Sequence, residues 1–164
     1  AHRRHGRGRD LDEIQSFALR QCQRLRRWHD PELLAVIVDP YELPSAWIVP
    51  TASRVLHTFE GADCRGAWIV AGSDDDARVF LGDAASKDLV FTDPDRRAIQ
   101  ALGVERLPAL VHVGADGVAE IAQGWDPETW RAVSDSLATA MSWSRPLIPA
   151  DGDPAPFEGT PAGG

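Results

Sequence analysis

The most reactive side chains in this sequence are those of two cysteines, Cys22 and Cys64, which stand 42 positions apart. No Cys-x-x-Cys pair occurs, and the cluster of four ligands that structural zinc needs is missing. Cys22 falls on the apolar stripe of a predicted helix, which favours a small buried residue over a reactive thiol. Cys64 follows Gly-Ala-Asp in a predicted loop. Arg65 would favour a thiolate there, although an incidental loop cysteine is the simpler interpretation.

Other catalytic patterns are missing from the sequence. It has no phosphate-binding loop, no Gly-x-Ser-x-Gly nucleophile turn and no His-Glu-x-x-His zinc motif. Five histidines are scattered, and the pair His2 and His5 lies in an arginine-rich stretch, where solvation is commoner than metal binding. We therefore predict neither a cofactor nor a metal.

Charge is distributed unevenly along the chain. The net charge is −8, but residues 1–29 carry eight arginines against three carboxylates, whereas residues 30–164 carry nine basic and 22 acidic side chains. A basic arm on an acidic body can dock on its own surface, bind an acidic protein or touch nucleic acid. The acidic remainder would repel phosphates, which argues against nucleic acid. We expect a protein partner, contacted through the arm and the C-terminal tail.

The hydropathy of the sequence bears on where in the cell the protein is expected. No apolar run reaches the roughly 18 residues that a membrane-spanning helix needs. The N-terminal stretch is basic and polar, without the apolar segment of a secretory leader. We therefore expect no membrane span and, by default, a cytoplasmic location.

The apolar pattern predicts one α/β domain between two irregular ends. Residues 1–9 form a basic arm, residues 10–143 the domain, and residues 144–164 a flexible tail rich in proline, glycine and aspartate. Within the domain, continuous or alternating apolar runs predict strands, and helical spacing predicts helices. The strands are expected at 33–38, 46–49, 67–71, 89–91, 110–113 and 118–122, and the helices at 10–28, 51–60, 74–81, 94–102 and 127–141.

The stretch from Leu89 to Trp125 carries the most specific pattern. Its helix begins at Asp93-Pro94-Asp95 and ends in Ala-Leu-Gly-Val, and Leu107-Pro108-Ala109 then precedes a strand. The turn Ala115-Asp116-Gly117 leads into a second strand that ends at Gly-Trp. This order resembles the C-terminal half of the thioredoxin superfamily, above all its peroxiredoxin-like and bacterial membrane-anchored reductase branches.

The resemblance covers roughly residues 45–142. It implies a thioredoxin-like three-layer α/β/α sandwich with a mixed central sheet, here with an N-terminal helical extension and an irregular C-terminal tail. In that family the proline before the strand is cis and faces the redox site, so the resemblance assigns this position to Pro108, preceded by Leu107.

The family's catalytic Cys-x-x-Cys begins a helix directly after the central strand. Unpaired N–H groups and the helix dipole stabilise a thiolate at that place. If residues 46–49 form that strand and Pro50 ends it, Thr51 and Arg54 occupy the two cysteine positions. A hydroxyl cannot form a mixed disulfide, so the site would have lost dithiol exchange.

Two hypotheses follow. In the first, the chain is a non-catalytic thioredoxin-like domain that serves as a protein-binding or accessory subunit of a larger complex. A redox complex is one such candidate. Thr51, Arg54, Leu107 and Pro108 would line its remnant peptide groove, and Trp28 and Trp143 would anchor a partner at the domain's ends. In the alternative, the chain is a thiol-disulfide oxidoreductase or peroxidase-like enzyme that uses Cys64, with Cys22 as resolving thiol.

Overall fold

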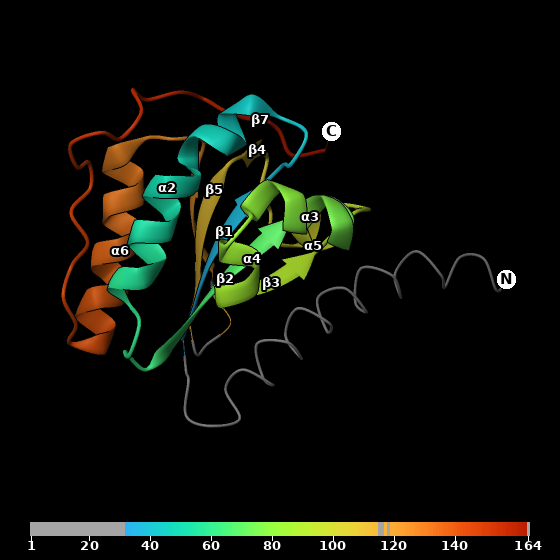
Figure 1. Cartoon of the computed structure of the whole chain (residues 1–164). Helices are drawn as coiled ribbons and strands as arrows, with labels where there is room; N and C mark the ends of the chain where they lie inside the picture. The colour runs from blue at the N-terminus through green and yellow to red at the C-terminus, as the bar shows by residue number, and fades with distance from the viewer. Residues whose placement is uncertain (1–31, 115–116, 118, 164) are drawn as a thin grey trace, which may run out of the picture.

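The computed structural model of the chain describes a sheet flanked by helices (Figure 1). The described residues are 32–114, 117 and 119–163. The predicted arm at 1–9 and the predicted helix at 10–28, with Cys22 and Trp28, lie outside the described residues, and so do Ala115 and Asp116 of the predicted turn.

A five-stranded mixed sheet forms the centre of the domain, in the order β3-β2-β1-β5-β6. Strands β1, β2 and β3 are parallel, whereas β5 and β6 run antiparallel to their neighbours. The strands span Glu32–Val38 (β1), Cys64–Val70 (β2), Leu89–Thr92 (β3), Ala109–Val113 (β5) and Ala119–Gln123 (β6). The five are close to the strands predicted from apolar runs.

Strand β1 separates two apolar cores because successive side chains of a strand point to opposite faces. Leu34, Val36 and Val38 pack with α2 (Leu43–Thr58), α3 (Asp74–Leu81) and α6 (Pro127–Met141). Leu33, Ala35 and Ile37 pack on the other face with Ile99 of α5 (Arg97–Ala101). The four-residue helix α4 (Ala84–Lys87) lies between α3 and β3. The helix–sheet–helix layering agrees with the predicted α/β/α class.

Helix starts follow the local signals in two cases. The Ser73 side chain accepts a hydrogen bond from the Asp76 N–H at the start of α3, and the Asp126 carboxylate accepts one from the Glu128 N–H at the start of α6. Helix α5 begins at Arg97, three residues later than predicted from Pro94. Asp93 still caps it, because its carboxylate accepts a hydrogen bond from the Ile99 N–H.

The predicted strand at 46–49 is wrong. Residues Leu43–Thr58 form one helix, α2, with Pro44 in its first turn and Pro50 in its interior. Ile48, Ala52 and Val55 recur at helical spacing across Pro50 and are all fully buried. Their burial against the sheet outweighs the preference of proline for ending a helix.

Two further expectations need correction. Cys64 is the first residue of β2 and is 8% exposed, so it does not lie in an open loop. The tail after α6 is irregular, as predicted, but it is packed on the domain rather than free. Its residues Thr160–Pro161 form β7, which pairs antiparallel with β4 (Arg106–Leu107).

The position of Pro50 yields a stability prediction. Replacing Pro50 by alanine should raise the free energy of unfolding by about 1–3 kcal/mol, because an interior proline lacks an N–H donor and crowds the preceding turn. Pro50 is exposed, so little packing is lost. Urea denaturation followed by far-UV circular dichroism measures the change.

Pro156→Ala is the matched control, since Pro156 is exposed outside any helix. It should bring no gain. If Pro50→Ala were neutral or destabilising, the helical assignment of residues 46–50 would be in doubt.

Candidate functional site

The start of α2 and the Leu107-Pro108 peptide meet at one end of the sheet. Strand β1 ends at Val38, and Ile37 pairs with Ala109, the residue after Pro108. The Leu107-Pro108 bond is cis, as the resemblance implied, and the Leu107 side chain is fully buried. The helix N-terminus beside this proline is therefore formed by residues 39–47, not by Thr51 and Arg54.

Residues 39–47 hold no cysteine, so the revised position of the helix start leaves the site equally without a thiol. The buried Asp39 organises this turn. Its N–H donates to Ser45 Oγ at 2.9 Å, and its carboxylate accepts hydrogen bonds from the Tyr41 N–H and from Arg96 Nη2. The Tyr41 hydroxyl donates to Asp76 at 2.5 Å, and this hydrogen bond raises the pKa of Tyr41 and lowers the pKa of Asp76.

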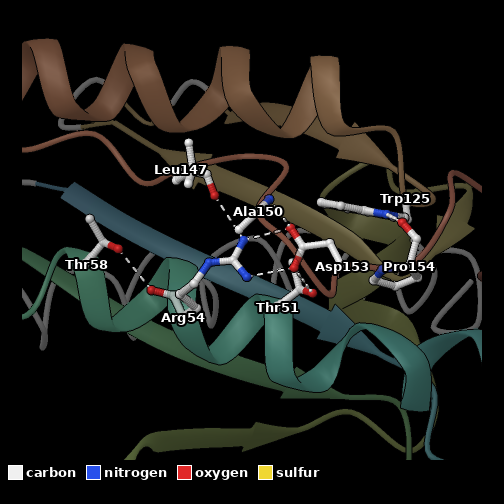
Figure 2. Close-up of polar contacts among 8 residues, drawn as sticks. All are labelled: Thr51, Arg54, Thr58, Trp125, Leu147, Ala150, Asp153 and Pro154. Carbon is white, nitrogen blue, oxygen red and sulfur yellow. Dashed lines mark hydrogen bonds and ion pairs between the residues drawn. The ribbon is translucent and has the colours of Figure 1, made fainter.

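Thr51 and Arg54 lie in the middle of α2 and bind Asp153 of the C-terminal segment (Figure 2). Thr51 Oγ1 donates to the carboxylate at 2.7 Å, and the two terminal nitrogens of Arg54 donate to its two oxygens at 2.6 and 2.8 Å. Arg54 Nη2 also donates to the Leu147 carbonyl at 2.9 Å. The fork geometry of guanidinium and carboxylate makes this the strong form of ion pair. The role of Thr51 and Arg54 in binding a partner stays a prediction.

The Asp153 carboxylate is almost completely buried, with 3% of its side chain exposed. Burial raises its pKa, but the hydrogen bonds from Arg54, from the Ala150 N–H and from Thr51 outweigh that effect and lower the pKa to about 2. The hydrogen bond between Arg54 and Asp153 also raises the pKa of Arg54. Sequence reasoning missed Asp153 because 99 residues separate it from Arg54.

One side of α2 near its start is apolar yet open to solvent. Leu43, Ala46, Trp47 and Pro50 are all exposed, Leu43 by 69% and Trp47 by 53%. Their spacing of three and four residues places them on one side of the helix. The Trp47 ring meets Phe157 edge to face, with 5.7 Å between ring centroids. We call these four residues the α2 face.

Cys64 lies at the opposite end of the sheet. It pairs with Glu32, six residues before the end of β1, which is roughly 20 Å along a strand. Its sulfur lies 3.9 Å from the Phe59 carbonyl. A cleft of about 560 Å³ is lined by Cys64, Arg65, His57 and Asp88, among others, and His57 and Asp88 are 3.4 Å apart. Cys64 therefore belongs to a different surface from Pro108.

Trp143, the other predicted partner anchor, lies just after α6. It is 38% exposed, and its indole N–H donates to the Thr58 carbonyl at 2.6 Å. This contact closes the end of α2 against the segment after α6. Partner binding at Trp143 stays a prediction.

Within the described ranges, no three His, Cys, Asp or Glu side chains gather in a way that could hold a metal ion. The acidic run Asp74–Asp76 forms the first turn of α3, where carboxylates favour the helix dipole. Across that same part of the chain, no helix is long and apolar enough to cross a membrane.

The comparisons with known proteins identify the fold. No protein-family model and no curated protein matches the chain. Solved structures do match. A protein of Chlorobium tepidum assigned as the thiol:disulfide interchange protein DsbE is 15% identical, with a TM-score of 0.58, over 69% of this chain and 82% of that one. The exposed lipoprotein thioredoxin Etrx1 of Streptococcus pneumoniae is 15% identical, with a TM-score of 0.53, over 72% and 88%.

A thioredoxin-related protein of Neisseria meningitidis serogroup B gives a TM-score of 0.52 at 15% identity, over 67% of this chain and 86% of that one. The chain therefore has the thioredoxin fold, as the sequence motifs predicted. Because one of these proteins is an exposed lipoprotein, cytoplasmic location stays a prediction.

The low pKa of Asp153 predicts how stability depends on pH. A carboxylate with a lowered folded-state pKa stabilises the protein above the unfolded-state value near 3.8, and this contribution is lost as the pH falls towards about 2. Asp153→Asn should therefore lower the free energy of unfolding by roughly 2 kcal/mol at pH 7. The deficit should shrink progressively between pH 4 and pH 2.

Urea denaturation of both proteins across this pH range measures the difference. Asp151→Asn, which alters an exposed neighbouring carboxylate, is the matched control and should have little effect. A deficit that did not depend on pH would mean that the Asp153 charge is not the source of the stabilisation.

Proposed function

We propose that this chain is a thioredoxin-like domain that binds another protein without dithiol catalysis, as an accessory subunit of a larger complex. The observation that carries the proposal is the α2 face. It belongs to the helix that follows β1, where the resemblance implies a redox cysteine pair, and residues 39–58 contain no cysteine. The end of β1 that leads into this helix pairs, through Ile37, with Ala109, the residue after the cis Pro108.

The chemistry of the α2 face supports a protein partner. A contiguous apolar patch with a half-exposed tryptophan at its centre is the usual form of an interface anchor. Trp47 packs edge to face on Phe157, and this contact favours one orientation of its ring in the free chain. A rigid, exposed aromatic ring loses little conformational freedom on binding, which favours its use as an anchor.

A thiol-disulfide oxidoreductase or peroxidase-like enzyme that uses Cys64 is the second candidate. The names of the solved proteins with this fold support it, and so does the cleft that brings Cys64 near His57. The low exposure of Cys64 and its distance from Pro108 speak against it. Cys22, the proposed resolving thiol, lies outside the described residues.

Site-specific crosslinking tests the binding proposal. A photoreactive phenylalanine analogue replacing Ala46, in the centre of the α2 face, should give one discrete adduct in the native lysate, and the adduct should persist in the presence of reductant. Adding Trp47→Ala should reduce its yield at least fivefold, because the anchoring ring is lost. The same analogue at Val79, which is 85% exposed on α3, is the matched control and should give no discrete adduct.

Equal adducts from positions 46 and 79 would contradict a specific interface on the α2 face. An adduct that needs oxidising conditions and disappears in Cys64→Ser would instead support the thiol enzyme.

Thiol titration separates the two candidates directly. In a Cys22→Ser background, native Cys64 should react with a disulfide reagent at least a hundredfold more slowly than in denaturant, because the thiol is buried. The colour released on reaction measures the rate. A fast native reaction that is abolished by Cys64→Ser would refute the non-catalytic reading.

A further inference from the structure

The segment from Asp153 to Ala162 crosses the domain as a strap. In Figure 1 it leaves the region of α6, passes the start of α2 at the top of the view and reaches β4, and Figure 2 shows its first anchors. We call residues 153–162 the strap. Beyond the anchor of Asp153 on α2, the Trp125 indole N–H donates to the Pro154 carbonyl at 2.7 Å. Trp125 and Phe157 then exchange two backbone hydrogen bonds, of 2.8 and 3.0 Å.

The strap ends as an added strand beside the cis proline. Leu107 pairs with Thr160 and Arg106 with Pro161, directly before Pro108. The Ala162 N–H donates to the Glu105 carbonyl at 2.9 Å, and Arg96 Nη1 donates to the Ala162 carbonyl. The strap therefore pairs with the main chain of residues 105–107. We call residues 105–107 the β4 edge.

Glycine is required where the strap and the rest of the domain approach each other most closely. Gly159 has a φ of +84°, and a Cβ there would stand 2.3 Å from the Leu107 carbonyl oxygen. Gly124, on the domain side, has a φ of +66°, and a Cβ there would stand 2.5 Å from the Glu158 carbonyl oxygen. Neither distance is possible for a side chain, so the β4 edge selects a glycine in the segment that pairs with it.

The strap is held by polar and main-chain contacts rather than by a large apolar area. Ala162 is its one fully buried apolar side chain, Phe157 is half-buried and Pro156 is exposed. Segments with little apolar burial open at a lower free energy than the core does. We therefore expect that detaching the strap from the β4 edge costs less free energy than unfolding the sheet.

We propose that the β4 edge is a binding site for an extended, glycine-containing peptide segment of a partner protein, and that the strap is its resident occupant in the free chain. Adding a strand to an exposed edge uses main-chain hydrogen bonds for affinity and pockets for selectivity. Here the close approach of Gly159 to Leu107 and the buried position of Ala162 supply the selectivity.

A competing segment must displace the strap, which is part of the same chain. For a short connection, the effective concentration of such a tethered segment is in the millimolar range. A partner anchored on the α2 face would overcome it by presenting its own segment beside Trp47, in the place that Phe157 of the strap occupies in the free chain. The inference rests on the proposed function for the origin of that segment. Whether the β4 edge binds a peptide at all can be tested separately.

The test uses the full chain and a fluorescein-labelled peptide with the sequence of residues 153–164, followed by fluorescence anisotropy. The wild-type chain, whose edge is occupied, should bind the peptide weakly. Gly159→Ala introduces a clash with Leu107 and a strained φ, so its strap should detach. We expect this variant to bind the peptide at least tenfold more tightly than the wild-type chain, and not to bind a peptide with alanine in place of Gly159.

Gly82→Ala is the matched control. Gly82, at the end of α3 and outside the strap, also has a positive φ, of +57°, but a Cβ there would meet no atom within 4 Å. This variant should bind the peptide as weakly as the wild-type chain. If Gly159→Ala does not fold, as judged by circular dichroism, Asp153→Asn loosens the other end of the strap without touching β4 and should also increase peptide binding.

Folded Gly159→Ala that binds neither peptide, or binds both equally, would overturn the proposal. So would a wild-type chain that exchanges straps in a stable dimer, because a second copy would then be the occupant. Loss of the crosslink in Trp47→Ala bears only on the α2 face, so failure there and failure here are distinguishable.

Discussion

Strand β1 is covered on both faces, and each of its residues from Leu33 to Val38 needs an apolar neighbour. Its even-numbered side chains require α2 and α6 on one face, and its odd-numbered ones require α5 and the Leu107 region on the other. A strand buried in this way must lie at the centre of its sheet. The chain leaving β1 then has to turn into α2 at the carboxyl end of the strand, beside Pro108, which fixes where the candidate site can form.

Helix α2 serves the structure and the site through different sides. Ile48, Ala52 and Val55 bury one side against the sheet. Thr51 and Arg54 point another side at the strap and hold the Asp153 carboxylate, while Leu43 and Trp47 leave a third side open to solvent. A buried carboxylate is tolerable only when several donors satisfy it, and Asp153 receives hydrogen bonds from Thr51, Arg54 and the Ala150 N–H. The strap is therefore positioned by charge, whereas the helix is positioned by apolar burial.

The fold and the residues of the site indicate different functions. Solved structures with this fold bear the names of thiol-disulfide oxidoreductases, but a fold hosts many activities and the activity is decided by the site. None of the described residues at the carboxyl end of β1 carries a thiol, and Cys64, the cysteine of the described part of the chain, lies at the other end of the sheet. The described domain instead has an exposed apolar side of α2 and a main-chain edge at β4, directly before Pro108, that the strap covers. We propose that both bind a partner.

The sequence by itself determined the elements whose signals are local. Apolar runs located the five strands of the central sheet, although a sixth predicted strand, at 46–49, is helical. Ser73 and Asp126 marked the starts of α3 and α6, and the motif before β5 predicted the cis Pro108 through its resemblance. Where a local signal competed with burial, the tertiary structure decided. Pro50 reads as a stop, yet α2 continues through it because Ile48 and Ala52 are buried together on the sheet.

Only the tertiary structure placed Cys64 under cover and brought Asp153 to Arg54. These outcomes depend on residues tens of positions apart, and the free energy that decides them is realised only when the whole domain has formed. A tail rich in proline and glycine cannot build a core of its own, so its composition indicates flexibility. Its ordering depends on the guanidinium, the indole and the strand edge that the folded domain offers, and none of these can be read from the tail's own residues.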